Sequence, residues 1–347
     1  MKKEMRIWIL QLITFVILVP IAISCSNTEE PENKEAVKSE VTENEAPAEL
    51  PVWKMPNVKN GAEAYFSPDG QSLICNAKFE DDSTHMVYTM KIDGTDILRI
   101  NDKGQDACSY YFPDGKKLIW TSTRDNTDLP EGDWSDGRNY PEGAELYTSD
   151  LDGGNVVRLT NNKVYDAEVS VSPDGTKILF TRQDENRSLD LWVMNADGSD
   201  EHQVTFTEAE QEGGSFYLAD SETIIYRAWL KSEEGKRGMA MTIYTIKDDG
   251  TDFKQITFEE GTNWAPFPTP DGKGFVFIKV LPPMNFEIYY MNIETSEQIR
   301  LTYNDAFDGF PVVSPDGKTL AFSSSRGNKK GVRSLGLFFM DISSLNL

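Results

Sequence analysis

Short apolar runs separated by tight-turn sequences recur along most of the 347-residue chain. Runs such as Lys177-Ile178-Leu179-Phe180 and Leu191-Trp192-Val193-Met194 are rich in β-branched and aromatic residues, a composition that favours strands. The intervening Pro-Asp-Gly and Asp-Gly-Thr or Asp-Gly-Ser sequences are typical of turns, because Pro presets φ, Asp caps its own backbone and Gly accepts a positive φ. Each repeating unit is therefore predicted to hold four antiparallel strands. No long stretch of the repeats has helical periodicity.

The Pro-Asp-Gly turn marks an internal repeat. It occurs five times, and its Asp residues lie 45, 60, 97 and 45 positions apart. The gap of 97 residues is two periods long, and a degenerate copy, 218–221, lies inside it. Six units of about 45 to 60 residues have the period of β-propeller blades. The predicted fold is all-β: a six-bladed β-propeller of four-stranded antiparallel blades.

The sixth unit is too short for four strands, since only six residues follow Asp341. An extended run, 52–55, precedes the first repeat, and its Trp53 stands 16 residues before Asp69, the spacing of a fourth strand. The N-terminal run is therefore predicted to complete the last blade. Such closure removes an exposed sheet edge. Residues 51–347 are predicted to form one propeller.

The repeat also has a family resemblance. The order Ser-Pro-Asp-Gly, strand, Ser/Thr-x-Arg, strand, Asp-Gly-Thr/Ser, Arg-x-Leu-Thr resembles the WD-type repeats of the TolB propeller family over residues 52–347. The resemblance implies a periplasmic component of the Tol–Pal envelope system. TolB has a further N-terminal α/β domain, whereas this chain has a leader and a short acidic segment in its place. The repeats also resemble the propellers of oligouronide lyases and those attached to serine peptidases.

The N-terminus predicts export and lipidation. A basic start followed by the apolar run 7–23 is the pattern of a secretory signal. The sequence Ala22-Ile23-Ser24-Cys25 resembles a bacterial lipobox, which implies a signal peptide over 1–24 and a palmitate-bearing, lipidated Cys25. The alternative is an uncleaved membrane anchor with a chance Cys. By resemblance to lipoprotein sorting signals, Ser26 implies the outer membrane rather than the inner one. The acidic run beyond it resembles the surface-export signal of Bacteroidetes lipoproteins.

Residues 25–50 are predicted to be a solvated tether, because 26–50 contain eight Glu against two Lys and almost no large apolar residue. The chain has a net charge of −23, and −19 remains on the propeller once the leader (+2) and the tether (−6) are removed. So acidic a body excludes nucleic acid and anionic headgroups as partners. It is compatible with a basic protein partner, a neutral sugar or divalent cations. The propeller is predicted to be monomeric.

Catalytic patterns are scarce. The chain has only two His residues, His85 and His202, and contains no nucleophile elbow, no His-Glu-x-x-His and no Cys pair with zinc spacing. The Asp-rich turns lack the remaining ligands of a calcium loop. No catalytic residue, cofactor or metal is therefore predicted. Cys75 and Cys108 lie in apolar strands of neighbouring blades, where two buried free thiols are favoured over a disulfide.

Two sets of polar residues stand out from the scaffold. A polar residue stands eight positions before the repeat Asp in five of the six units, and a basic residue ends each second strand. Both sets are predicted to crowd the channel mouth, on the face shared by the loops between strands four and one and between strands two and three. One interpretation is that they form strand-end Arg–carboxylate pairs that tie the blades together. The other is that they form a charged ligand pocket. The two interpretations are compatible. The first set is Asp106, Asp166, Glu212, Asn263 and Asp308, and the second is Lys78, Arg124, Arg182, Arg227, Lys279 and Arg326.

The insertions fall on the same face. Blade two inserts 123–141, which includes Trp134, Arg138 and Tyr140, and Trp264 adds an aromatic residue in blade five. Loops that grow on one face of a rigid scaffold usually carry binding function. The alternative for Trp134 and Tyr140 is the internal packing of a lid. The predicted function is a lipid-anchored cell-envelope binding module, either a protein–protein scaffold or an oligosaccharide-capturing propeller. The alternative is an oligouronide lyase-like or other carbohydrate-active enzyme using Arg and a carboxylate at the channel mouth.

Overall fold

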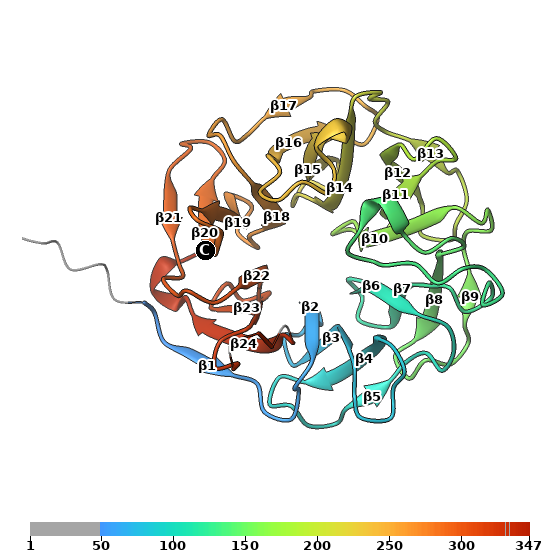
Figure 1. Ribbon diagram of the computed structural model, residues 1–347, viewed down its shortest axis with the longest axis horizontal. Helices are drawn as coiled ribbons and strands as arrows, with labels where there is room; N and C mark the ends of the chain where they lie inside the picture. The colour runs from blue at the N-terminus through green and yellow to red at the C-terminus, as the bar shows by residue number, and fades with distance from the viewer. Residues whose placement is uncertain (1–48, 330, 333) are drawn as a thin grey trace, which may run out of the picture. The chain divides into compact units, whose positions relative to one another are not determined.

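The computed structural model describes residues 49–347 except 330 and 333, and these form six four-stranded antiparallel sheets arranged in a ring (Figure 1). Each sheet is one blade, and the strand that enters it from the preceding blade lies nearest the central channel. The predicted all-β, six-bladed propeller is confirmed. Blade 1 is β2 (Gly61–Phe66), β3 (Ser72–Ala77), β4 (Met86–Lys91) and β5 (Leu98–Arg99); blade 2 is β6 (Asp106–Tyr111), β7 (Lys117–Ser122), β8 (Glu145–Asp150) and β9 (Val157–Arg158); blade 3 is β10 (Tyr165–Val171), β11 (Lys177–Gln183), β12 (Leu189–Asn195) and β13 (His202–Gln203); blade 4 is β14 (Glu210–Tyr217), β15 (Thr223–Leu230), β16 (Thr242–Lys247) and β17 (Lys254–Gln255); blade 5 is β18 (Asn263–Pro268), β19 (Gly274–Leu281), β20 (Asn285–Asn292) and β21 (Gln298–Arg300); blade 6 is β22 (Asp308–Val313), β23 (Thr319–Ser324), β24 (Gly336–Asp341) and β1 (Val52–Lys54).

The Pro-Asp-Gly turns join the first two strands of the blades, and local hydrogen bonds account for their repetition. In blade 1, the Ser67 hydroxyl donates to Asp69 Oδ1 (2.6 Å), and Gly70 has a φ of +69°, which favours glycine. Blade 4 keeps this geometry without the motif. There Asp220 accepts from two backbone N–H groups, and Ser221 takes a φ of +57°. The degenerate copy is thus a sixth turn of the same kind.

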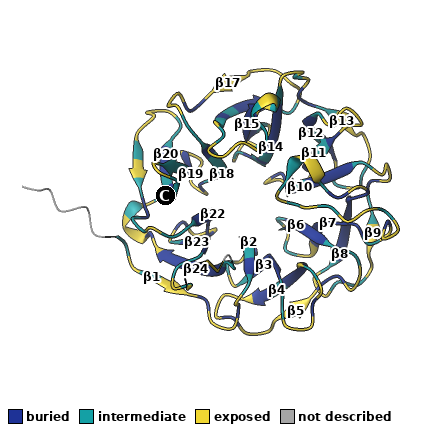
Figure 2. Ribbon diagram, viewed as in Figure 1, coloured by how far each residue is buried: buried dark blue, intermediate teal, exposed yellow. Residues whose placement is uncertain are grey.

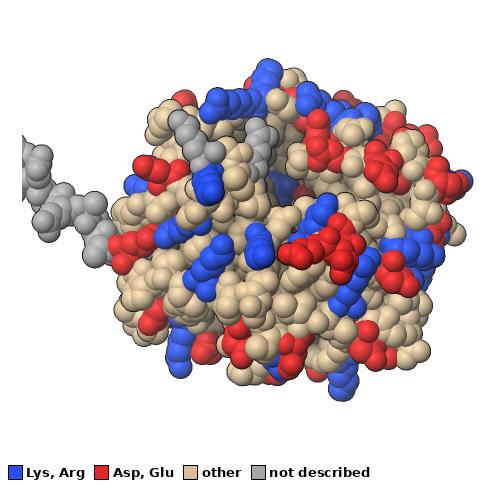
Figure 3. Space-filling view, turned by 60° about the horizontal axis from the view of Figure 1, so that its bottom comes forward, with Lys and Arg blue, Asp and Glu red and all other residues tan. Residues whose placement is uncertain are grey.

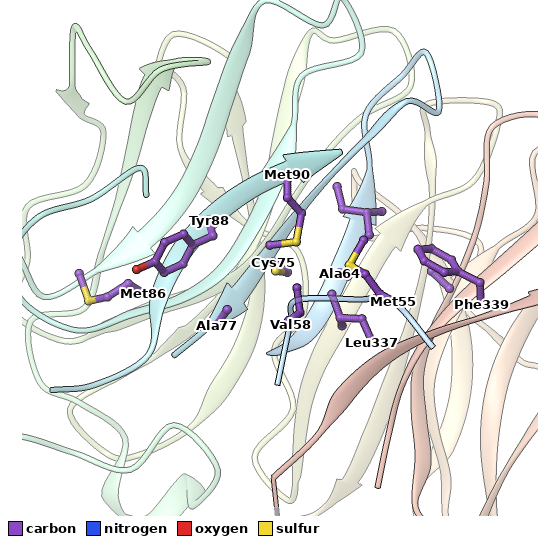
Figure 4. Packing of buried hydrophobic residues seen from close by; sticks show 12 residues of the cluster. Met55, Val58, Ala64, Cys75, Ala77, Met86, Tyr88, Met90, Leu337 and Phe339 are labelled. Atoms are coloured by element: carbon purple, nitrogen blue, oxygen red, sulfur yellow. The ribbon is translucent and has the colours of Figure 1, made fainter. Parts of the chain in front are cut away.

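The ring is closed by the N-terminal strand, as predicted. β1 pairs antiparallel with β24, with Trp53 opposite Phe339. The chain then continues through Met55 and Val58 toward β2. Both side chains are buried in the seam between blades 6 and 1, in one cluster with Leu337 and Phe339 (Figure 4). The first and last parts of the propeller are therefore joined both by a β-ladder and by a hydrophobic core.

Buried residues fill the blades and the seams between them, whereas exposed residues lie on the outer strands and loops (Figure 2). The largest fully buried side chains include Trp120, Tyr147 and Phe180. Trp120 and Tyr147 stack within blade 2, with ring centroids 5.1 Å apart. Burial of each such side chain stabilises the fold by about 2–3 kcal/mol, so the blades themselves are rigid supports for the loops.

Helix is scarce in the described part of the chain. It comprises the three-residue 3-10 turns η1 (Gly137–Asn139), η2 (Lys231–Glu233) and η3 (Ser343–Leu345). η1 lies in the insertion of blade 2, and η2 lies in a second insertion, 231–241, between β15 and β16 of blade 4. Among the residues that the structure describes, no helix has the length and apolar character needed to cross a membrane.

Each innermost strand carries a β-bulge at the same place. The register with the second strand shifts there in all six blades, and one residue of the bulge has a positive φ. These residues stand six positions before the Asp of the turn. A bulge re-aims a side chain, and here all six residues line one central cavity. They are Glu63, Cys108, Glu168, Gly214, Ala265 and Phe310.

Four aromatic rings from the innermost strands close the middle of the channel, and we call them the aromatic plug. The ring centroid of Tyr65 lies 5.2 Å from that of Tyr110, 5.7 Å from that of Phe216 and 6.1 Å from that of Phe267. Three of the four, Tyr65, Phe216 and Phe267, line both of two cavities of about 380 and 360 Å³. The plug therefore separates a cavity on the insertion face from one on the face of the Pro-Asp-Gly turns.

Candidate ligand site at the channel mouth

The cavity on the insertion face is the candidate site. Its volume of about 380 Å³ falls within the range of about 300 to 1,000 Å³ typical of ligand pockets. The bulge residues form its floor, and the insertions of blades 2 and 4 form part of its wall. Figure 3 shows a hollow in the upper part of the view, with charged side chains of both signs around it.

The floor holds two carboxylates and one guanidinium. Arg227 of β15 donates through Nη2 to Glu168 Oε1 of β10 (2.9 Å), an ion pair between blades 4 and 3. Glu63 of β2 accepts from Asn76 Nδ2 (3.1 Å), and its Oε2 lies 3.7 Å from Cys108 Sγ. No Lys or Arg among the described residues forms an ion pair with Glu63. Burial and the nearby charge of Glu168 raise the pKa of Glu63 to about 7, against the opposing attraction of Arg227.

Arg227 reaches the floor because of a one-residue difference in register. In blade 3, Arg182 lies opposite Asp166 and pairs with it (Nε–Oδ1 2.6 Å). In blade 4, Arg227 lies one position earlier, opposite Gly213. Since side chains alternate along a strand, this offset turns Arg227 to the other face. Gly214 leaves the necessary space, because a Cβ on it would lie 1.8 Å from Arg227 Nη1.

Aromatic side chains form the upper wall. Tyr140 stacks on Tyr165 with ring centroids 4.2 Å apart and an interplanar angle of 9°, and the centroid of Trp134 lies 6.0 Å from that of Tyr165. Across the cavity, Trp264 meets Phe310 edge to face at 4.9 Å. Trp134 and Tyr140 therefore pack on the propeller, as the lid alternative expects, and they also line the cavity. Such rings offer a flat apolar surface with polar edges.

Unpaired polar atoms gather at this cavity. Trp134 Nε1, Ser215 Oγ, Arg227 Nε and Trp229 Nε1 are buried without a hydrogen-bond partner among the described residues, and all four residues line the cavity. Trp229 is 5% exposed and Ser215 is 1% exposed. A buried donor without a partner costs about 1–3 kcal/mol. These four atoms lie behind the surface of the cavity, so the wall carries this cost without presenting them to a ligand.

The insertions of blades 2 and 4 meet beside the cavity. Asp136 caps η1 by accepting from Arg138 N (3.1 Å), and its carboxylate pairs with the same guanidinium through Nε and Nη2, both at 2.8 Å. A Cβ on Gly137 would lie 1.9 Å from Glu234 Oε1 of the other insertion, and one on Gly235 would lie 2.7 Å from Arg138 Cζ. The two loops are therefore in direct contact.

Most of the predicted polar and basic residues lie outside the cavity, in contrast to the expectation that both sets crowd the channel mouth. Asp308 is fully buried beneath Arg326, whose guanidinium also binds Glu49 (2.6 Å). The pair of Arg326 with Asp308 is formed within one blade, as is the pair of Arg182 with Asp166 in blade 3. In both pairs the Arg side chain turns back toward the strands of its own blade. Of the predicted site residues, Trp134, Tyr140, Arg227 and Trp264 line the cavity, whereas Asp106, Arg124, Arg138, Asp166, Arg182, Glu212, Asn263, Lys279, Asp308 and Arg326 do not.

Both cysteines outside the N-terminal segment are free thiols, as predicted, but only one is buried. Cys75 lies in the core of blade 1. Cys108 is half-buried and lines the cavity, because the bulge, with a φ of +33° at this residue, turns its side chain to the channel. Its deep position and the charges of Glu63 and Glu168 raise the pKa of the Cys108 thiol well above its usual value. It is thus a neutral thiol rather than a reactive thiolate.

Sequence reasoning identified Arg227 but missed the other residues of the floor. Glu63 and Glu168 stand at the same offset from the repeat Asp in blades 1 and 3. Each is a charged residue in the middle of a strand that faces the centre of the ring. Buried charges are rare unless they are paired or functional, so this position is a signal that the sequence contains. Ser215, Trp229 and Phe310 offer no comparable signal, because such residues are common in strands.

Comparison with known proteins finds relatives that match part of the chain, although no protein-family model matches it. The chain is 28% identical over 137 residues to the protein TolB homolog of Chlorobium luteolum, a match that covers 39% of this chain and 28% of the relative. It is 25% identical over 217 residues to the Tol-Pal system protein TolB of Francisella tularensis, covering 60% of this chain and 48% of that relative. The matches thus span less than half of each relative.

Solved structures show the same architecture. TolB from Acinetobacter baumannii superposes with a TM-score of 0.58 at 19% identity, over 82% of this chain and 61% of that one. An oligogalacturonate lyase from Vibrio parahaemolyticus superposes with a TM-score of 0.56 at 13% identity, over 86% of this chain and 95% of that one. At such identities the likeness shows the fold alone. By its fold, its repeats and its sequence relatives, the chain is a TolB-like six-bladed β-propeller.

Proposed function

We propose that the protein is a binding module of the bacterial cell envelope and that its channel mouth captures a protein partner. The observation that carries the proposal is a cavity of about 380 Å³ with charged groups on its floor and an aromatic wall. A concave site with a few oriented polar groups is the usual form of a binding pocket. Rigid aromatic residues and Arg are the residue types that dominate protein–protein contacts.

The envelope location rests on the N-terminal sequence. A secretory signal over 1–24, a lipidated Cys25 and an acidic tether would hold the propeller at the outer membrane, on its periplasmic or outer surface. The tether is shorter than the predicted 25–50, because Glu49 pairs with Arg326 and Leu50 packs on the propeller. Residues 1–48 lie outside the residues that the structure describes. The support for this part of the proposal is therefore the lipobox-like sequence itself. The name of the Francisella relative, a Tol-Pal system protein, favours the same setting.

A pull-down from solubilised envelope tests the proposal. Trp134→Ala combined with Arg138→Ala should weaken capture of the partner with little change in melting temperature, because both residues lie on an insertion outside the blade cores. Asp152→Asn, on an exposed turn of the opposite face, is the control and should leave capture unchanged. Capture that survives the double substitution but is lost in the control variant would place the interface on the face of the Pro-Asp-Gly turns and overturn the proposal.

The second candidate is capture of an oligosaccharide. The edge-to-face pair of Trp264 and Phe310, with Trp134 in the opposite wall, offers aromatic surfaces of the kind that stack on sugar rings. The lyase-like enzyme is a version of this candidate, in which Arg227 and a floor carboxylate act on the bound sugar. Among the described residues, no group of three or more His, Cys, Asp or Glu is arranged to hold a metal ion. A glycan array with the same protein, followed by an assay for unsaturated uronide products from any hit, separates these possibilities from protein capture.

A further inference from the structure

The charge balance on the cavity floor leaves one carboxylate uncompensated. Arg227 is committed to Glu168 through a 2.9 Å ion pair. Glu63 receives only neutral donors, the Asn76 amide at 3.1 Å and the Cys108 thiol at 3.7 Å, and both reach the same oxygen, Oε2. Among the described residues no donor reaches its other oxygen, Oε1. A negative charge in a confined site attracts a cation more strongly than the same charge on the surface.

The walls suit the rest of a cationic side chain. Trp134, Tyr140, Trp264 and Phe310 line the space above the floor. Such rings pack against an alkyl stem, and their faces attract a cation electrostatically. Lys and Arg combine an apolar stem with a charged tip. The depth and chemistry of the cavity therefore match a long cationic side chain better than a compact cation.

We propose that the channel mouth recognises a lysine or arginine side chain of a protein partner, with Glu63 binding the cationic group and the aromatic wall packing against the alkyl stem. This rests on the proposed function, since it names the chemistry of the captured segment. The net charge of the propeller, −19 over 51–347, attracts a basic partner over longer distance. The cavity lining itself is acidic on balance, with four carboxylates (Glu63, Asp136, Glu168 and Glu234) against two cationic groups (Arg227 and Lys236).

Synthetic peptides test the inference directly. Acetylated, amidated tripeptides that differ only in the central residue, Lys, Arg, Gln or Glu, are titrated into the propeller by calorimetry. We expect the Lys and Arg peptides to bind and the Gln peptide to bind at least about tenfold more weakly, the usual effect of losing a charged hydrogen bond. Equal binding of the Gln peptide, or tighter binding of the Glu peptide, would overturn the inference.

Variants locate the interaction at Glu63. Glu63→Gln should weaken binding of the Lys peptide about tenfold or more, and Glu63→Lys, which places a cation in the site, should abolish it. Glu294→Gln removes the same charge from an exposed turn of the opposite face and should change nothing. Melting curves confirm that each variant is folded. Full binding of the Lys peptide by Glu63→Gln would refute the assignment.

The two proposals fail in different ways. If the pull-down captures an envelope protein but the peptides show no preference for Lys or Arg, the cation site is wrong and protein capture stands. If the cationic peptides bind but no envelope protein is captured, the cation site stands and the proposed function is wrong. Binding of free spermidine as tightly as of the Lys peptide would show that the site takes a small polyamine rather than a protein segment.

Discussion

Replacing Glu63 by Gln should stabilise the protein at alkaline pH, because the carboxylate is held on the channel floor at an energetic cost. The pKa of Glu63 is raised from 4.5 to about 7, first by burial and then by the charge of Glu168. The folded protein therefore binds a proton more tightly than the unfolded chain between these two values. Stability contributed by this proton is present at low pH and is lost as the pH rises through about 7.

The size of the effect follows from the shift. A rise in pKa from 4.5 to about 7 corresponds to at most about 3–4 kcal/mol at 1.36 kcal/mol per unit. The carboxyl group faces an open cavity, so we expect solvent to reduce this to about 1–2 kcal/mol. For a domain of this size, that is an increase in melting temperature of about 2–6 °C.

Urea unfolding of the parent and of Glu63→Gln at about pH 8 and about pH 5 measures the difference. The variant should be the more stable protein at the higher pH, and the two should be nearly equal at the lower one. Glu294→Gln makes the same chemical change on an exposed turn and should show no such pH dependence. A variant that is less stable than the parent at the higher pH would mean that the attraction of Arg227 outweighs burial, and the reasoning would be refuted.

Three further predictions concern closure, pairing and anchoring. Deletion of 51–57 should lower the melting temperature by several degrees, because it removes β1 and the buried Met55, whereas deletion of 26–48 should not; equal melting of both truncations would contradict ring closure. Arg326→Ala should destabilise by about 3–5 kcal/mol in urea, because Asp308 is left buried and unpaired, and a loss no larger than that of the exposed Arg138→Ala would argue against the pair. Cys25→Ala should release the protein from membranes, and globomycin should make the precursor accumulate; a variant that stays membrane-bound would exclude lipidation at this residue.

The sequence predicts the parts of the fold that repeat. A Pro-Asp-Gly sequence favours one turn conformation, so six such turns at the period of a blade imply six blades. The missing fourth strand of the last unit implies closure by 52–55. The floor of the site cannot be predicted in this way. Its six bulge residues share a positive φ, but their side chains differ in size from none at Gly214 to a phenyl ring at Phe310. The repeated backbone conformation therefore does not determine which side chain faces the channel.

Arg227 shows the same limit at a single residue. Its sequence position resembles those of Arg182 and Arg326, because each follows the apolar run of a second strand. Only the strand register reveals that Arg227 lies opposite Gly213 and faces the other side. The spacing between the repeat Asp and this basic residue varies by several residues from blade to blade. A one-residue offset of Arg227 therefore cannot be recognised in the sequence. The repeat alone is enough to predict the strand-end pairs. Predicting the ion pair between Arg227 and Glu168 also requires the strand register.

The aromatic plug sets how the candidate site is used. Since Tyr65, Tyr110, Phe216 and Phe267 close the ring halfway, a bound chain cannot thread from one face to the other. Whatever enters must leave by the same opening, so release cannot be driven by passage through the ring. The plug also limits how far a side chain can extend into the cavity, so the site selects by length. A side chain that is too short does not reach Glu63, and one that is too long meets the rings of Tyr65, Phe216 and Phe267.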